Sequence, residues 1–318
     1  MCIRDSTHST WALADHDAFV MLFISVGFMY WLRAVKYAGS ARISKTTSPH
    51  PLSFVRAFHD VAANRQAALA NAALAGVAFG IVSLGWKGFV VGPSILFLAY
   101  ALQVALNMFR RRDSTTLSVM FLVMLATTFL MALPFYAHPQ LNLVFDSTGL
   151  QPFLFIFGFT IAIAFVTTGF RDKPWLLVLG TLTAVAAVFF TVLYVLKTLE
   201  ISDAWDVLFT GSGYFTKTKI FGTVAEANAP NRAQLFASFG PITFLLALIM
   251  GGGLLWRGLR HRNGTALVFG VWVFAATFMA WNAARFMFNA TPIMAILGAA
   301  GIVAVSYTHL RAHETCVH

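Results

Sequence analysis

Long apolar runs separated by short polar connections fill the chain from end to end. A helix needs about 20 mostly apolar residues to cross the roughly 30 Å of hydrocarbon in a bilayer. Nine stretches approach this length: 18–35, 66–85, 89–109, 115–136, 152–170, 175–196, 242–258, 265–281 and 286–305. Each is apolar on all sides, and lipid cannot satisfy exposed backbone groups, so we predict helices. The pattern therefore predicts an all-α, polytopic membrane helical bundle.

Composition agrees with this pattern. Hydrophobic residues make up 58% of the 318 positions and charged residues only 11%, whereas soluble domains carry about 25% charged residues. A water-soluble globular fold is therefore excluded.

The net charge of +10 is better explained by membrane topology than by nucleic-acid binding. Most basic residues fall in alternate connections between the apolar stretches, as the positive-inside rule predicts for cytoplasmic loops. These residues are Arg42, Lys45, Arg56, Arg65, Arg110, Arg111, Arg112, Arg171, Lys173, Arg257, Arg260 and Arg262. The other connections then face outward, including 86–88, 137–151, 197–241 and 282–285. No nucleic-acid partner is expected.

Both ends of the chain differ from the rest. MCIRDS at 1–6 and the polar segment 306–318 resemble translated adapter sequence, and we expect both to be non-native; ordinary polar tails are the alternative. The only two cysteines, Cys2 and Cys316, lie in these tails, so neither a disulfide framework nor a thiolate metal site is expected. The native segment is then 7–305, with 197–241 as its long outer loop.

Acidic residues are scarce, and several fall on the predicted outer side. Asp15 and Asp17 flank His16 just before the first apolar stretch. Two carboxylates at this spacing can bind one hard cation or divide the work between metal and supporting shell. The alternative is a solvated helix start, where an acid favours the helix dipole.

Two further polar residues share that side. Glu226 lies in TVAEANAP (223–230), within the long outer loop, where a solvated loop acid is the alternative interpretation. Arg285 opens the last apolar stretch; it could snorkel to the headgroups, but its planar fork also suits phosphate. Together these residues suit metal-assisted chemistry on a lipid-linked phosphate.

Four segments then resemble, in order, motifs of the oligosaccharyltransferase catalytic subunit family. They are ADHDAFVM (14–21), VSLGWKGFVV (82–91), TVAEANAP and AARFMFNATPIMAILG (283–298). The family counterparts are an Asp-x-Asp-type motif, a Trp-x-Gly turn, a Thr-x-x-Glu-type loop motif and an Arg-Phe pair opening a later helix. The resemblance covers nearly all of 7–305 and is nearest to prokaryotic, archaeal-like single-subunit forms.

The resemblance implies a C-type glycosyltransferase membrane domain in the cell membrane with its active site facing outward. The family has thirteen spans, and the first span here corresponds to the fourth. The outer loop 197–241 then falls between the ninth and tenth, as the family requires. The family's first-loop aspartate and its C-terminal sequon-reading domain have no counterpart in 1–318, so we expect this polypeptide to be inactive alone.

The resemblance also implies roles for individual residues. The family transfers an oligosaccharide from a polyprenyl (dolichyl) phosphate or diphosphate to the Asn of Asn-x-Ser/Thr in an acceptor protein. Asp15, Asp17 and Glu226 correspond to residues at a Mn²⁺ or Mg²⁺ site, with Asp15 and Glu226 catalytic. Glu226 and Thr223 are expected to hold the acceptor, and Arg285 the donor phosphate. Membrane lipids are expected to surround the domain.

Two other function classes remain open. A membrane transporter would place ionisable residues near the bilayer midplane and use broken helices in inverted repeats. Another C-type lipid-linked sugar transferase, such as a protein O-mannosyltransferase or an arabinosyltransferase, would share the spans and an outward acidic motif. It would not be expected to carry the TVAE-type loop.

Overall fold

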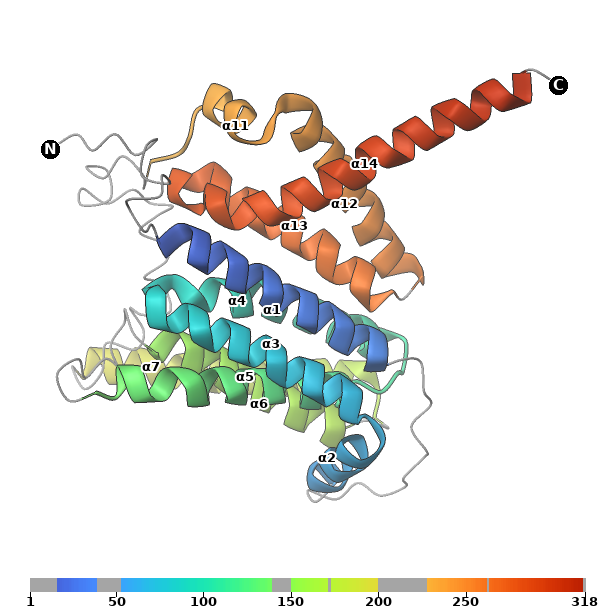
Figure 1. The fold of residues 1–318 in the computed structure, drawn as a ribbon. Coiled ribbons are helices and arrows are strands. Elements are labelled where there is room, and N and C mark those ends of the chain that lie inside the picture. The colour runs from blue at the N-terminus through green and yellow to red at the C-terminus, as the bar shows by residue number, and fades with distance from the viewer. Residues whose placement is uncertain are drawn as a thin grey trace, which may run out of the picture. The chain divides into compact units, whose positions relative to one another are not determined.

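The computed structural model describes residues 16–38, 53–138, 150–170, 173–199, 228–261 and 263–316. The chain divides into two compact units, Met1–Gly211 and Ser212–His318, and each is considered by itself. Within the described ranges, all regular structure is helical (Figure 1). Nine helices in those ranges are long and apolar enough to cross a membrane. The predicted all-α, multi-pass membrane architecture is confirmed.

The spanning helices match the predicted apolar stretches closely. The first unit contains α1 (His16–Ala38), α3 (Gln66–Gly85), α4 (Val91–Phe109), α5 (Thr115–Tyr136), α6 (Gln151–Gly169) and α7 (Trp175–Thr198). The second contains α12 (Pro241–His261), α13 (Gly264–Asn282) and α14 (Met287–Cys316). The last helix continues beyond the predicted end at residue 305.

Shorter helices lie between the spans. They are α2 (Ser53–Asn64), α11 (Arg232–Phe239) and the 3-10 turns η2 (Lys87–Val90) and η4 (Ala284–Phe286). Sequence reasoning missed α11, although its start carries a recognisable signal. Asn231 accepts a hydrogen bond from the Gln234 backbone N–H at 2.7 Å, and the Gln234 side chain accepts one from the Asn231 N–H at 2.9 Å. This reciprocal pair is a capping box.

The first unit is organised around α3, which packs against both α1 and α5 (Figure 1). Gly76 allows the close contact with α5, because a Cβ there would overlap the Met124 carbonyl oxygen and lie 2.8 Å from Thr127 Cβ. Thr128 Oγ1 then donates across the interface to the Gly76 carbonyl oxygen at 3.1 Å. Small residues allow such approach in membranes, where packing and hydrogen bonds replace the hydrophobic driving force.

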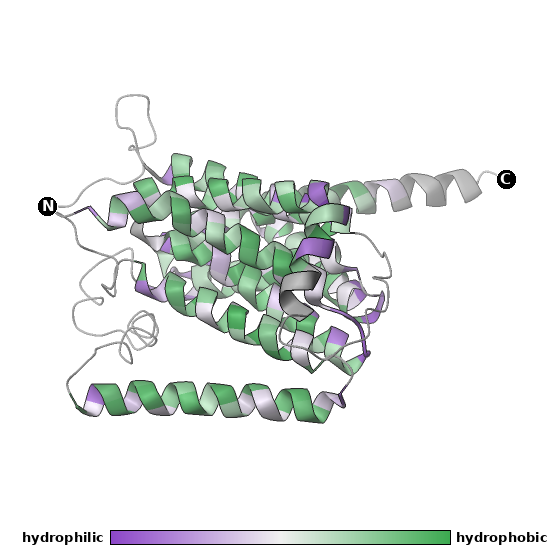
Figure 2. Ribbon diagram, turned by 90° about the horizontal axis from the view of Figure 1, so that it is seen from below, coloured by the Kyte–Doolittle hydropathy of each residue, from purple (hydrophilic) through white to green (hydrophobic). Residues whose placement is uncertain are grey.

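The second unit is a three-helix cluster in which α12, α13 and α14 contact one another, while α11 contacts α12 and α14. Its core includes the fully buried Val273, Ala276 and Ile293. In both units, apolar residues cover the lengths of the helices and hydrophilic residues gather toward their ends (Figure 2). This distribution is expected for helices whose ends meet water and whose flanks meet lipid.

Candidate functional site

The structure describes two of the five predicted site residues. Asp17 lies in the first turn of α1 and is partly exposed, and Arg285 lies in η4 and is also partly exposed. Asp15, Thr223 and Glu226 fall outside the described residues. Asp17 belongs to the first unit and Arg285 to the second.

The start of α1 lies beside the end of α3. A Cβ on Gly85 would lie 3.2 Å from Cε1 of Phe19, two residues after Asp17. Trp86 follows directly, and its backbone N–H donates to the Val82 carbonyl oxygen at 2.9 Å. Two of the motifs, the Asp-x-Asp-type segment and the Trp-x-Gly turn, therefore meet at one end of the first unit.

The Trp-x-Gly turn has a steric explanation. Trp86 is extended, with φ −148° and ψ 123°, and its indole folds back over Gly88. A Cβ at Gly88 would overlap Cζ2 of that ring and lie 2.5 Å from Cε2. Glycine at this position thus keeps the indole against the turn. The next residue, Phe89, has its ring centre 5.8 Å from that of Tyr136 and 5.7 Å from that of Phe153.

Basic residues occupy the opposite end of the first unit. Helix α4 runs from the Trp86 turn to the Arg110–Arg112 turn, and its 19 residues correspond to about 28 Å. At that far end the rings of Phe109 and Trp175 lie 4.9 Å apart, which places Lys173 near the arginines. The separation of Asp17 and Trp86 from the arginines agrees with the charge-based topology within this unit.

In the second unit, the turn that carries Arg285 is joined to the segment following TVAE. The Ala284 backbone N–H donates to the Asn228 carbonyl oxygen at 2.9 Å. Asn228 stands two residues after Glu226 in the chain. Ser238, in α11, adds a contact between its hydroxyl and the Met287 sulfur at 3.8 Å. The end of the long loop is therefore held against the Arg285 turn.

Asn289 is a further candidate residue, which the sequence pattern did not single out. It lies four residues after Arg285 along continuous right-handed helix, so the two share a helix face. Its side chain is 2% exposed, and among the described residues neither amide atom has a hydrogen-bond partner. An unsatisfied amide is costly to bury. The signal in the sequence was an amide one turn from an arginine in an apolar stretch.

The proposed cation site contains three carboxylates, those of Asp15, Asp17 and Glu226. No group of three His, Cys, Asp or Glu side chains comes together among the residues that the structure describes. Of the proposed ligands only Asp17 is among them. The donor set as a whole, three carboxylates, matches the oxygen ligands that Mn²⁺ and Mg²⁺ prefer, so the residue types fit a hard cation.

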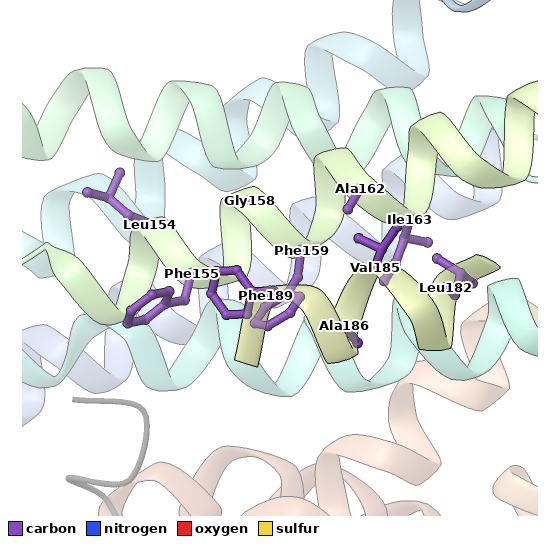
Figure 3. Close-up of a pocket in the computed structure, with 10 residues that line it drawn as sticks. All are labelled: Leu154, Phe155, Gly158, Phe159, Ala162, Ile163, Leu182, Val185, Ala186 and Phe189. Atoms are coloured by element: carbon purple, nitrogen blue, oxygen red, sulfur yellow. The ribbon is translucent and has the colours of Figure 1, made fainter. Parts of the chain in front are cut away.

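A cavity of about 390 Å³ lies between α6 and α7. Figure 3 shows its lining from both helices, including Phe155 and Phe159 of α6 and Phe189 of α7. All ten lining residues are apolar or glycine. The cavity supplies no acid, base or ligand and is not a candidate for the chemistry.

Comparison with known proteins gives a consistent result at the level of the fold. No protein-family model matches the chain, and no curated protein matches its sequence. Among solved structures, the Archaeoglobus fulgidus oligosaccharyltransferase in its apo form matches with a TM-score of 0.68 and 18% identity, over 95% of this chain. Archaeal oligosaccharyltransferase AglB from the same organism, in complex with an inhibitory peptide and a dolichol-phosphate, matches with a TM-score of 0.67 and 18% identity, again over 95% of this chain.

The chain has the fold of the AglB membrane domain. It spans 35% and 34% of the lengths of the two AglB chains. The expected likeness to the oligosaccharyltransferases is thus confirmed in three dimensions. At 18% identity the likeness to AglB establishes the fold alone.

Proposed function

We propose that this chain is part of a membrane glycosyltransferase that moves an oligosaccharide from a polyprenyl phosphate or diphosphate to the side-chain amide of Asn in Asn-x-Ser/Thr. The AglB fold supports the lipid-linked donor, since one matched AglB structure contains a dolichol-phosphate and an inhibitory peptide. The observation that carries the proposal is the 2.9 Å hydrogen bond from Ala284 to Asn228. It joins an acidic loop to the turn of the phosphate-binding candidate Arg285.

The chemistry requires help for both reactants. The lone pair of an amide nitrogen is delocalised into its carbonyl, so the acceptor is a poor nucleophile. Carboxylates of Asp15 and Glu226 could accept hydrogen bonds from its N–H groups and twist the amide out of conjugation. Thr223 would support the acceptor side of the same loop.

The donor phosphate leaves with negative charge. Arg285 would hold that phosphate through its planar pair of N–H donors, and Asn289 would add an amide donor one helical turn away. A Mn²⁺ or Mg²⁺ bound by Asp15, Asp17 and Glu226 would supply positive charge to the leaving oxygen. The side chains themselves fix the acceptor and donor, which lowers the entropy cost of bringing them together.

The distribution of acids disfavours a transporter. Among the nine candidate spans of the described structure, the only acidic residue is Asp17, at the first position of its span. Coupled transporters place ionisable groups near the midplane. The TVAE-type loop likewise favours an Asn acceptor over other C-type sugar transferases.

The direct test is Glu226→Gln in a full-length protein that contains this segment. Gln keeps the size but loses the charge, so both the KM for an Asn-x-Thr peptide and kcat should worsen, with a rate loss of about 10²–10³. Glu200→Gln, in the same outer loop, is the matched control and should change little. Equal, small effects at both positions in peptide glycosylation assays would remove Glu226 from the mechanism.

A further inference from the structure

The turn between α4 and α5 contains three consecutive arginines, Arg110, Arg111 and Arg112, in an unusual backbone. Arg111 has φ 52° and is the only non-glycine residue with positive φ among the described residues. L-residues with a Cβ are disfavoured in this left-handed region, and glycine is the usual occupant. Such an outlier points to a requirement on the side chain rather than the backbone.

The hydrogen bonds identify the turn as a Schellman motif. The Arg112 N–H donates to the Asn107 carbonyl oxygen at 2.8 Å, and the Arg111 N–H donates to the Met108 carbonyl oxygen at 3.1 Å. In this motif the left-handed position after the helix end is normally glycine. Here it is an exposed arginine. The motif would form with less strain if Arg111 were glycine, so folding alone does not explain the residue.

Side-chain contacts fix the same turn in place. Gln103 Nε2 donates to Asn107 Oδ1 at 3.1 Å, and Asn107 Nδ2 donates to Ser114 Oγ at 3.1 Å. The nearby acid, Asp113, accepts from the Thr115 backbone N–H at 3.0 Å and from the Thr115 hydroxyl. The chain thus presents its arginines on a rigid support rather than on a loose loop.

An aromatic pair lies beside the arginines. The rings of Phe109 and Trp175 are 4.9 Å apart, Phe109 is 58% exposed, and the exposed Lys173 precedes the tryptophan by two residues. Tryptophan rings settle at the depth of the lipid headgroups because they are amphipathic. Basic clusters next to them attract anionic headgroups. Both features occur together at the end of α4 opposite Trp86.

We propose that Arg110–Arg112, Lys173, Phe109 and Trp175 form a binding site for the headgroup of an anionic phospholipid. The arginines and the lysine bind the phosphate, while the aromatic pair packs against the glycerol and upper chain region. The site is separate from the proposed chemistry, because α4 runs between the two ends. Its occupant is a lipid rather than a soluble anion because the aromatic pair supplies an apolar wall next to the charges.

Titration of the purified 318-residue chain in neutral detergent with phosphatidylglycerol or phosphatidylcholine, read by native mass spectrometry, tests the proposal. Loss of one arginine near a membrane surface should weaken phosphatidylglycerol binding about fivefold. Arg111→Gln and Arg111→Gly should both show this loss, with phosphatidylcholine binding unchanged. Arg111→Gly should also have a higher Tm than Arg111→Gln, because glycine relieves the left-handed strain while the binding falls.

Arg33→Gln is the matched control. Arg33 is exposed on α1, whose neighbouring Trp31 packs on Phe121 near the α5 start at the same end of the unit. Its loss should leave phosphatidylglycerol binding within twofold of the parent. Equal losses of phosphatidylglycerol binding in Arg33→Gln and Arg111→Gln would show that only the overall charge matters, which would overturn the proposed site. Full competition by inorganic phosphate would overturn the assignment of a lipid as the occupant.

Discussion

Replacing Asn289 with Leu should stabilise the protein and impair its proposed reaction at the same time. Leu branches at Cγ as Asn does, so the change replaces the two amide atoms by carbons of similar arrangement. Both amide atoms are buried, and within the described structure neither has a hydrogen-bond partner. Leaving such a group unsatisfied costs about 1–3 kcal/mol.

The lower end of that range applies in a membrane helix, where hydrogen bonds average about 0.6 kcal/mol because the unfolded state also finds partners. We therefore expect a gain of about 1 kcal/mol, which corresponds to about 2 °C in Tm for a chain of this size. Thermal unfolding in detergent measures the shift. Asn289→Ala checks that the sign of the change in Tm does not depend on the bulk of the Leu side chain.

Thr128→Val is the matched polar-to-apolar control within a helix interface. Thr128 is fully buried, and its hydroxyl donates to the Gly76 carbonyl oxygen at 3.1 Å and to the Met124 carbonyl oxygen at 3.0 Å. Its loss should lower the free energy of unfolding by about 0.5–1.5 kcal/mol. The two substitutions should therefore have opposite signs, and a lower Tm in both would refute the reasoning about the unsatisfied amide.

The functional half of the prediction uses a full-length protein containing this segment. If Asn289 donates to the donor phosphate, Asn289→Leu should raise the KM for the lipid-linked donor about tenfold, the effect of losing roughly 1.4 kcal/mol of binding. The KM for the acceptor peptide should stay unchanged. A more stable variant with unaltered donor kinetics would confine Asn289 to a structural role.

Three other outcomes follow from the same structure. Gly76→Ala should lower the free energy of unfolding by about 1–3 kcal/mol, since its Cβ meets the Met124 backbone; an unchanged Tm in thermal unfolding would show that α3 and α5 can move apart freely. Arg285→Lys in the full-length protein should raise the KM for the lipid-linked donor, because lysine lacks the bidentate fork; equal donor KM values would argue against a phosphate contact. Asp15→Ala should abolish Mn²⁺-dependent transfer, and a variant with the parent's metal dependence would favour a solvated acid.

The sequence by itself determined the membrane class, the positions of the membrane spans and the orientation signal. These depend on local properties: about 20 apolar residues are required for a span, and basic residues collect on one side whatever the helices contact. It also showed Asp17, Glu226 and Arg285 as charged residues in an apolar chain, and Trp86 as part of a Trp-x-Gly turn. The types of the charged residues suggested a chemistry before any contact was known.

Tertiary structure decided which of these residues share an end of a unit. Phe19 against Gly85, and Ala284 against Asn228, are contacts between segments far apart in the chain, and no local pattern predicts them. The burial of its amide distinguishes Asn289 from an ordinary polar residue on a helix. The positive φ of Arg111 distinguishes it from an ordinary basic residue in a loop. The burial and the dihedral angle are both set by the packed helices. The same residues in another fold would be exposed and unstrained.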